Sequence, residues 1–304
     1  MKENRALLIF KMGCLLLLWL FPGVLGAQDR LPVRAPKSHR MKRLKPYRAV
    51  YSLADTIAVT DSFPLRFRGM GDNLIENQST VLDSIFSRLR EMLSGNKGDT
   101  LHIVHIGDSH VRGHIFPQRI GELLTRTFQG IDYVDMGVNG ATCLTFTHPN
   151  RIMEVAKKKP DLLILSFGTN ESHNRSYQEN PHYHQMNELI SLLRDSLPKI
   201  PIILTTPPGS FERIRYRRRR SRYVVNPRTE KAVTTIKRYA KAHQLAVWDL
   251  YAAVGGRQRA CENWIDSGLM RPDHVHFFAD GYLFQGDLFY RAFIKAYNKY
   301  VVSH

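Results

Sequence analysis

Short apolar runs alternate with helical stretches along most of this 304-residue chain, and this alternation constrains the fold more than any other feature. Five runs have the length and composition of buried strands: LHIVHI (101–106), IDYVDM (131–136), DLLILSF (161–167), PIILTT (201–206) and LAVWDL (245–250). Helical periodicity covers 81–93, 183–197, 229–243 and the segment after Ser109. Strands and helices that alternate at this spacing build a parallel sheet with helices on both faces. We therefore expect an α/β domain around a mainly parallel five-stranded sheet.

The first 27 residues have the pattern of a secretory signal peptide. Lys2, Arg5 and Lys11 precede an apolar stretch, residues 12–25, which small residues follow. That stretch is shorter than the roughly 20 apolar residues that a bilayer span requires. We therefore expect cleavage near residue 26 or 27 and export of the protein.

A strong positive charge restricts the partners of the chain. The formal net charge is +17, and about +15 remains once the signal is lost, because its three basic residues and one acidic residue leave with it. One basic segment, residues 28–77, contains proline and is weakly periodic, which indicates an N-terminal extension ahead of a domain spanning 78–304.

The second basic segment is the arginine run from Arg213 to Arg222. Two interpretations are open: a solvated, flexible loop, or a docking surface for an anionic polymer or a membrane surface. Nucleic acid is not expected as a partner, because no aromatic stacking motif accompanies the charge and the chain is expected to be exported.

Three strand ends carry glycine-containing polar loops: GDSHVRG, GVNGATC and GTNESHN. The carboxyl ends of parallel strands meet at one edge of the sheet, and ligands bind at that edge. Ser109 in the first loop could act as a nucleophile whose own backbone N–H faces the developing oxyanion. Gly140 allows close approach of a second backbone N–H, and Asn170 offers a side-chain amide donor. We expect these three residues to form an oxyanion hole.

A nucleophilic serine needs a general base, and the segment RPDHVHFFADGY near the C-terminus supplies one. Asp273 and His276 are three residues apart, a spacing that lets the carboxylate reach the imidazole in a loop. The carboxylate would fix the tautomer of the ring and stabilise its charged form. His274 is the alternative base.

Histidines are frequent near the first loop, so a metal site must be considered. His102 and His105 are an odd number of residues apart on a strand, so they point to opposite faces. His110 and His114 are expected on one helix face, without a cysteine or carboxylate at matching spacing. We therefore expect no metal and no cofactor.

Five further residues near these motifs have open roles. His110 could pack behind the site or line it, and Glu171 and His173 could line the substrate pocket or be solvated; all three are candidate substrate-binding residues. Cys143 and Cys261 are the cysteines outside the signal. No disulfide framework is expected, and whether these two cysteines pair stays open.

The four motifs GDSH, GVNGA, GTNE and DHVH resemble the SGNH hydrolases, also called the GDSL family, in order and in spacing. The resemblance covers roughly residues 78 to 300. It implies a three-layer α/β/α sandwich of the flavodoxin-like kind. It also implies an acyl-enzyme mechanism that uses Ser109, His276 and Asp273.

One departure narrows the resemblance. His110 replaces the leucine of the GDSL block, and together with NWIDSGLMRPDHVHF this is similar to the branch that includes peptidoglycan O-acetylesterases and their acetyltransferase relatives. That branch implies a bacterial periplasm or cell envelope and a serine esterase that removes acyl groups, chiefly acetyl, from a glycan such as O-acetylated peptidoglycan. An O-acetyltransferase of the same family and a non-catalytic basic protein that binds envelope polymers are the alternatives.

Overall fold

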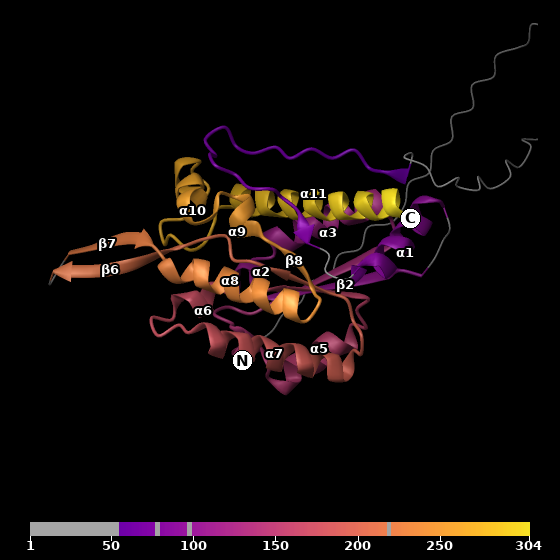
Figure 1. Ribbon diagram of the computed structural model, residues 1–304, viewed down its shortest axis with the longest axis horizontal. Helices are drawn as coiled ribbons and strands as arrows, with labels where there is room; N and C mark the ends of the chain where they lie inside the picture. The colour runs from indigo at the N-terminus through magenta and orange to yellow at the C-terminus, as the bar shows by residue number, and fades with distance from the viewer. Residues whose placement is uncertain (1–54, 77–79, 96–98, 218–219) are drawn as a thin grey trace, which may run out of the picture. The chain divides into compact units, whose positions relative to one another are not determined.

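A central sheet with the five expected parallel strands forms the middle of the protein, and a sixth, antiparallel strand completes one edge (Figure 1). The computed structural model describes residues 55–76, 80–95, 99–217 and 220–304. The strand order is β1-β8-β5-β4-β2-β3. The strands are β1 (Ile75–Glu76), β2 (Leu101–Gly107), β3 (Ile131–Gly137), β4 (Leu162–Ser166), β5 (Ile202–Thr205) and β8 (Ala246–Trp248).

Helices cover both faces of this sheet, which gives the three layers predicted from the sequence (Figure 1). The helices are α1 (Asp83–Leu93), α2 (Ser109–Arg112), α3 (Ile115–Phe128), α4 (Cys143–Phe146), α5 (Pro149–Lys157), α6 (Thr169–His173), α7 (Glu179–Ser196), α8 (Pro227–Ala242), α9 (Leu250–Ala253), α10 (Gly256–Asp266) and α11 (Ala279–Ser303). None of the helices described here is long and apolar enough to cross a membrane.

The period-two geometry of a strand divides the core into two apolar clusters, one on each face. In β2, Leu101 and Ile103 join the cluster under α1, α3 and α11, whereas Val104 and Ile106 join the one under α5, α7 and α8. All four side chains are almost completely buried. Because both faces are covered, the strand is nearly continuous in apolar residues. The loops at its carboxyl end are then the free edge where polar groups can collect.

Residues 55–76, which the sequence assigns to the N-terminal extension, pack along α11 (Figure 1). The Asn298 side chain on that helix exchanges hydrogen bonds of 2.9 and 2.8 Å with the backbone of Ile57. Phe67 is 2% exposed and belongs to the core. Apolar side chains of this segment therefore belong to the domain core, although the segment precedes residue 78, where the domain was expected to start.

The signal peptide expected over residues 1–27 lies outside the described residues, and so does the extension up to residue 54.

The described part of the arginine run is not a loop but forms much of an antiparallel pair of strands, β6 (Phe211–Arg217) and β7 (Arg220–Val225). These strands make a separate two-stranded sheet that projects from the body of the domain (Figure 1). We call this pair the arginine hairpin. Aromatic and β-branched residues such as Phe211, Ile214 and Val224 favour strands; the arginines between them obscure that signal in the sequence.

Candidate active site

Ser109 stands at a sharp turn where β2 ends and α2 begins. Asp108 has extended backbone angles (φ −90°, ψ −151°) and caps the helix, since its Oδ1 accepts the His110 N–H at 2.9 Å. Burial is the main cause that raises the pKa of Asp108 to about 8. The carboxyl group is thus mostly protonated at pH 7, so it adds little negative charge beside the serine. Asp108 was not among the predicted site residues, although an aspartate just before a helix start is a capping signal.

A close backbone contact fixes this turn against the neighbouring strand. A Cβ atom at Gly137, the last residue of β3, would lie 2.1 Å from the backbone nitrogen of Arg112 in α2. Only a residue without a side chain fits there. The first turn of α2 therefore sits directly on the end of β3.

The structure brings Ser109 together with the pair expected near the C-terminus. Ser109 Oγ lies 2.9 Å from His276 Nε2, and His276 Nδ1 lies 3.0 Å from Asp273 Oδ2. His274, the alternative base, instead packs its ring on Tyr223 of the arginine hairpin, with centroids 4.0 Å apart. The hydrogen-bonded order is thus serine hydroxyl, imidazole, carboxylate.

The backbone of the same loop holds the Asp273 carboxylate in place. Its Oδ1 accepts N–H bonds from Val275 at 2.9 Å and from His276 at 2.8 Å. Partial burial favours the neutral acid, but these bonds and the His276 side chain together lower the pKa of Asp273. The residue is therefore a carboxylate at neutral pH, able to hold Nδ1–H of the imidazole.

The three expected oxyanion donors lie in the loops that follow β2, β3 and β4. Gly140 adopts the left-handed conformation (φ +70°) that favours glycine, and open space surrounds it. Asn170 Nδ2 donates to Ala141 O at 2.9 Å, which orients the amide beside the Gly140 loop and leaves its second N–H for a ligand. Among the described residues, the backbone N–H groups of Ser109 and Gly140 have no acceptor.

Comparison with known families decides the relationship. The family model of the GDSL-like lipases and acylhydrolases matches residues 105–283, more than half of the chain. The chain belongs to this family. This GDSL-like protein is a carboxylic ester hydrolase, and the matched segment spans the serine turn, the loops of Gly140 and Asn170 and the Asp273–His276 loop.

A solved structure shares the fold of this GDSL-like hydrolase. A peptidoglycan O-acetylesterase aligns with a TM-score of 0.63 at 17% identity, over 76% of this chain and 99% of that one. A lipase/acylhydrolase from Enterococcus faecalis aligns with a TM-score of 0.48 at 21% identity, over 65% of this chain and 97% of that one. No curated protein sequence matches the chain.

His110 of this GDSL-like hydrolase packs behind His276, the expected general base. It is 5% exposed, its Nδ1 lies 3.1 Å from the Tyr282 hydroxyl, and its ring centroid lies 5.4 Å from that of His276. Burial lowers the pKa of His110 to about 3, and His276 adds to the shift. A neutral ring therefore supports His276, and its burial leaves no surface for substrate.

Glu171 joins two loops of the site instead of lining an open pocket. It is 5% exposed. Its Oε1 accepts the backbone N–H of Cys143 at 2.7 Å, and its Oε2 accepts that of Gly168 at 2.9 Å. The carboxylate thus ties the loop after β3 to the loop after β4, so it positions Gly140 and Asn170 relative to each other. The sequence indicated a polar residue here but not this cross-link, which depends on tertiary contact.

His173 is half-buried and connects the site to the start of the arginine hairpin. Its Nε2 lies 2.9 Å from Ser210 Oγ, and burial followed by the nearby Arg228 lowers the pKa of His173. The backbone carbonyl of Ser210 accepts a weak hydrogen bond from the Cys261 thiol at 3.5 Å.

Cys143 and Cys261 are both free and buried, so these two cysteines do not pair.

One buried group in the described chain has side chains close enough to hold a metal ion. Cys143, Glu171 and His182 each offer a ligand atom within 4.8 Å of the others. However, both Glu171 oxygens already accept backbone N–H groups, so we assign no metal to this group.

The expected shared helix face of His110 and His114 is wrong, because α2 ends before His114, whose φ of +66° breaks the helix.

Proposed function

We propose that this protein is an exported serine esterase that removes acetyl groups from an O-acetylated cell-envelope glycan such as peptidoglycan. The hydrogen-bonded chain from Ser109 Oγ through His276 to Asp273 carries the proposal. A hydroxyl gains a nucleophile's reactivity when a neighbouring base can take its proton and a carboxylate stabilises the resulting imidazolium.

The proposed reaction is a double displacement. Ser109 Oγ attacks the acetyl carbonyl carbon while His276 Nε2 takes the hydroxyl proton, and the N–H groups of Ser109, Gly140 and Asn170 stabilise the oxyanion. His276 then donates its proton to the departing sugar oxygen, which leaves an acetyl-serine. Water, deprotonated by His276, releases acetate and restores Ser109.

Exposure of the site favours a small acyl group on a large, polar carrier. The His276 side chain is 33% exposed and that of Asp273 is 47% exposed. A polymer can approach such an open edge, and an acetyl group needs little depth. The likeness in fold to a peptidoglycan O-acetylesterase supports the same substrate class, and the signal-like residues 1–27 support export to the envelope where such a glycan occurs.

Mass spectrometry of muropeptides tests this proposal. O-acetylated peptidoglycan is incubated with purified protein lacking residues 1–27, with the Ser109→Ala variant as control. We expect loss of acetyl groups and release of free acetate with the wild type alone. Acetyl groups that persist on the glycan, or that move to an added acceptor glycan in place of water, would contradict the hydrolase and in the second case favour the acetyltransferase.

A further inference from the structure

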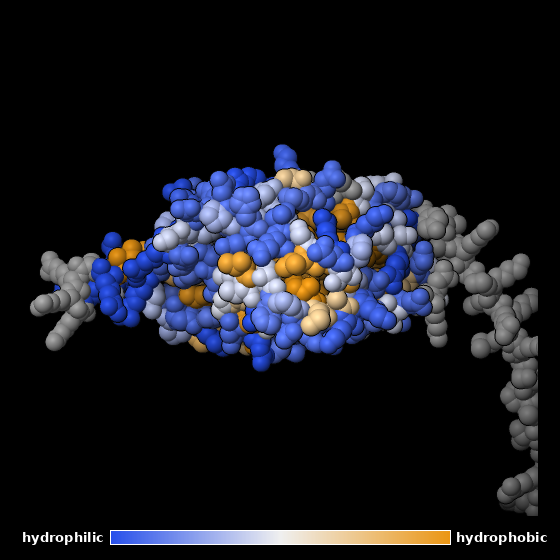
Figure 2. Space-filling view, turned by 90° about the horizontal axis from the view of Figure 1, so that it is seen from below, coloured by the Kyte–Doolittle hydropathy of each residue, from blue (hydrophilic) through white to orange (hydrophobic). Residues whose placement is uncertain are grey.

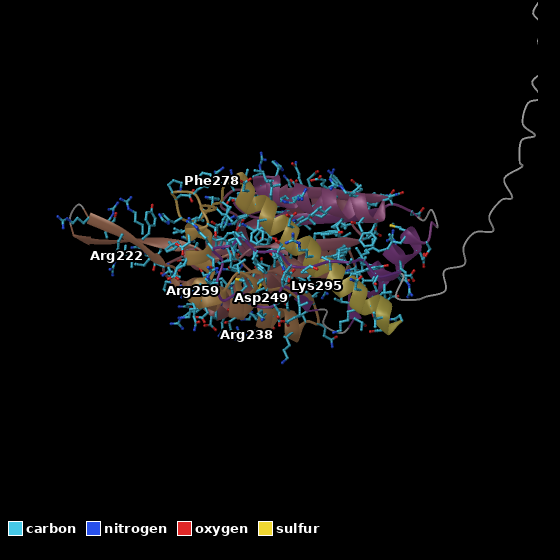
Figure 3. All side chains as sticks on the ribbon, turned by 90° about the horizontal axis from the view of Figure 1, so that it is seen from above. Arg222, Arg238, Asp249, Arg259, Phe278 and Lys295 are labelled. Carbon is cyan, nitrogen blue, oxygen red and sulfur yellow. The ribbon has the colours of Figure 1, made fainter. Side chains whose placement is uncertain are left out.

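The arginine hairpin (Phe211–Arg217 and Arg220–Val225) concentrates positive charge on an arm that projects beyond the domain (Figures 1 and 3). Its exposed arginines in the described part of the chain are Arg213, Arg215, Arg220 and Arg222. The space-filling view shows a mostly hydrophilic surface over this end of the molecule (Figure 2). The sequence carries no lysine on the arm.

Within the described chain these charges lack acidic partners. None of the four forms an ion pair with a carboxylate among the described residues, and Glu212, the acid of the hairpin, is bound by Arg228 at 2.6 Å. A two-stranded hairpin without a core is itself only marginally stable. Exposed arginines without acidic partners on a marginally stable hairpin indicate an anionic ligand.

The base of the hairpin is attached to the loop that contains Asp273 and His276, called the catalytic loop below. The Phe211 N–H donates to the backbone carbonyl of His274 at 2.9 Å. The His274 ring contacts both Phe211, at 5.2 Å between centroids, and Tyr223, at 4.0 Å. His274 directly follows Asp273, so a ligand bound along the arm is held beside the residues that orient the catalytic imidazole.

The strand register sets which side chains continue this surface outwards. Arg213 stands opposite Tyr223, and Arg215 stands opposite Ser221. Alternate residues of a strand share a face, so both arginines lie on the face of the hairpin that carries the two rings against His274. Cationic groups therefore extend from the catalytic loop towards the tip.

We propose that the arginine hairpin is a docking arm for carboxylate groups on the same glycan polymer whose acetyl esters the site hydrolyses. This inference rests on the proposed function. Guanidinium groups bind carboxylates through two parallel hydrogen bonds, a geometry that lysine lacks. Binding along the arm raises the local concentration of esters at Ser109, as expected for linked sites.

The distribution of side chains favours a polymer over a membrane surface. A membrane-bound element presents one apolar face to the lipid. Here arginine occurs on both faces, since Arg222 stands opposite Ile214 on the face away from Arg213 and Arg215. Ile214 and Tyr223, 36% and 41% exposed, are the large apolar side chains that the described part of the arm exposes. A flexible chain can contact both faces, whereas a flat bilayer cannot.

Kinetics on two substrates test the docking arm. The triple variant Arg213→Gln/Arg215→Gln/Arg222→Gln is compared with the wild type on soluble O-acetylated peptidoglycan fragments and on a chromogenic acetate ester. We expect KM for the polymer to rise about tenfold with kcat nearly unchanged, because binding through rim charges is lost. On the small ester, kcat/KM should stay within about twofold. Amidation of the polymer carboxylates should abolish the difference between the two proteins.

A matched control removes three positive charges elsewhere. Lys157, Lys158 and Lys159 are exposed and precede β4, so they lie at the opposite edge of the sheet from the serine. We expect their triple substitution by Gln to leave KM for the polymer within about twofold. An equal rise in both triple variants would overturn the proposal, because net charge alone would then explain binding.

Binding without turnover separates this inference from the proposed esterase function. The Ser109→Ala variant, with and without the three arm substitutions, is sedimented with insoluble peptidoglycan and with vesicles of anionic phospholipid. We expect the intact arm to bring the protein down with peptidoglycan and the substituted arm to release it, even if the glycan proves not to be the substrate. Equal sedimentation of both proteins with peptidoglycan, or arm-dependent binding to the vesicles alone, would overturn it.

Discussion

At the scale of single residues, two buried groups beside Ser109 are neutral, Asp108 and His110. Burial leaves Asp108 largely protonated and His110 uncharged at neutral pH. In the proposed reaction, the His276 ring becomes positively charged when it takes the proton from Ser109. The Asp273 carboxylate, 3.0 Å from the ring, stabilises that positive charge.

Asn170→Ala tests the oxyanion donors. Loss of one preorganised donor should lower kcat on an acetate ester by roughly 10²–10³-fold with little change in KM, since the bond forms fully only in the transition state. Steady-state kinetics measure this. Asn174→Ala, at the end of α6, is the control. Equal kcat values for Asn170→Ala and the wild type would exclude this residue from the oxyanion hole.

Sequence patterns suffice for residues whose chemistry depends on local context. Ser109, Asn170 and the Asp273–His276 pair follow from loop position and spacing. The roles of Glu171 and His110 do not, because one depends on a hydrogen bond to Cys143, 28 residues away, and the other on Tyr282, 172 residues away. Such contacts exist only after the chain has folded.

Elements with a strong apolar pattern are predictable from the sequence, and short or charged ones are not. All five expected strands form. Runs of buried apolar side chains define β2, β4, β5 and β8, whereas in the edge strand β3 Ile131 is buried and Val134 and Met136 are partly buried against the core. β1 has two residues, too few for any periodicity. A contact next to the strand stabilises it: the side chain of Asn73, two residues before β1, accepts the Trp248 indole N–H at 2.9 Å. The arginine hairpin escaped prediction because charge masks its strand-forming residues.

Gly137→Ala tests the contact between β3 and α2. The added methyl group cannot fit 2.1 Å from a backbone nitrogen, so we expect a loss of about 3 kcal/mol in the free energy of unfolding and reduced activity as the serine turn shifts. Chemical denaturation measures the first effect. Gly113→Ala, whose Cβ would meet only ordinary contacts at 3.6 Å and beyond, should be nearly neutral. Equal stability of the two variants would contradict the close packing.

At the scale of the whole domain, the first described segment contacts the last helix. The segment 55–76 lies along α11 (Figure 1), and Asp61 forms an ion pair with Lys295 of that helix. α11 begins at Ala279, just after the loop of Asp273 and His276, so these contacts also secure the helix next to that loop. The predicted boundary at residue 78 separates this segment from the domain. The contacts that join the two form between side chains far apart in the sequence, so the sequence pattern does not reveal them.

A buried histidine makes the stability of the whole domain depend on pH. His105 is 0% exposed, and burial lowers its pKa to about 3. Between about pH 3 and 6.5 the unfolded chain therefore binds a proton that the folded one does not, so stability falls as pH falls through this window.

His105→Gln should reduce the dependence of unfolding free energy on pH between 4 and 6 by up to about 1.4 kcal/mol per pH unit, the value for one proton. Denaturation at a series of pH values measures it, with His184→Gln on the exposed side of α7 as the control for loss of a histidine. An unchanged slope in His105→Gln would show that His105 takes up its proton in the folded state as well.

Covalent trapping tests the central claim, that His276 and Asp273 make Ser109 a nucleophile. The protein is treated with a serine-directed fluorophosphonate and digested, and the modified peptide is identified by mass spectrometry. We expect one adduct, on Ser109, that forms together with loss of esterase activity and forms far more slowly in His276→Ala. Full inactivation with Ser109 unmodified, or undiminished ester hydrolysis by Ser109→Ala, would contradict the account.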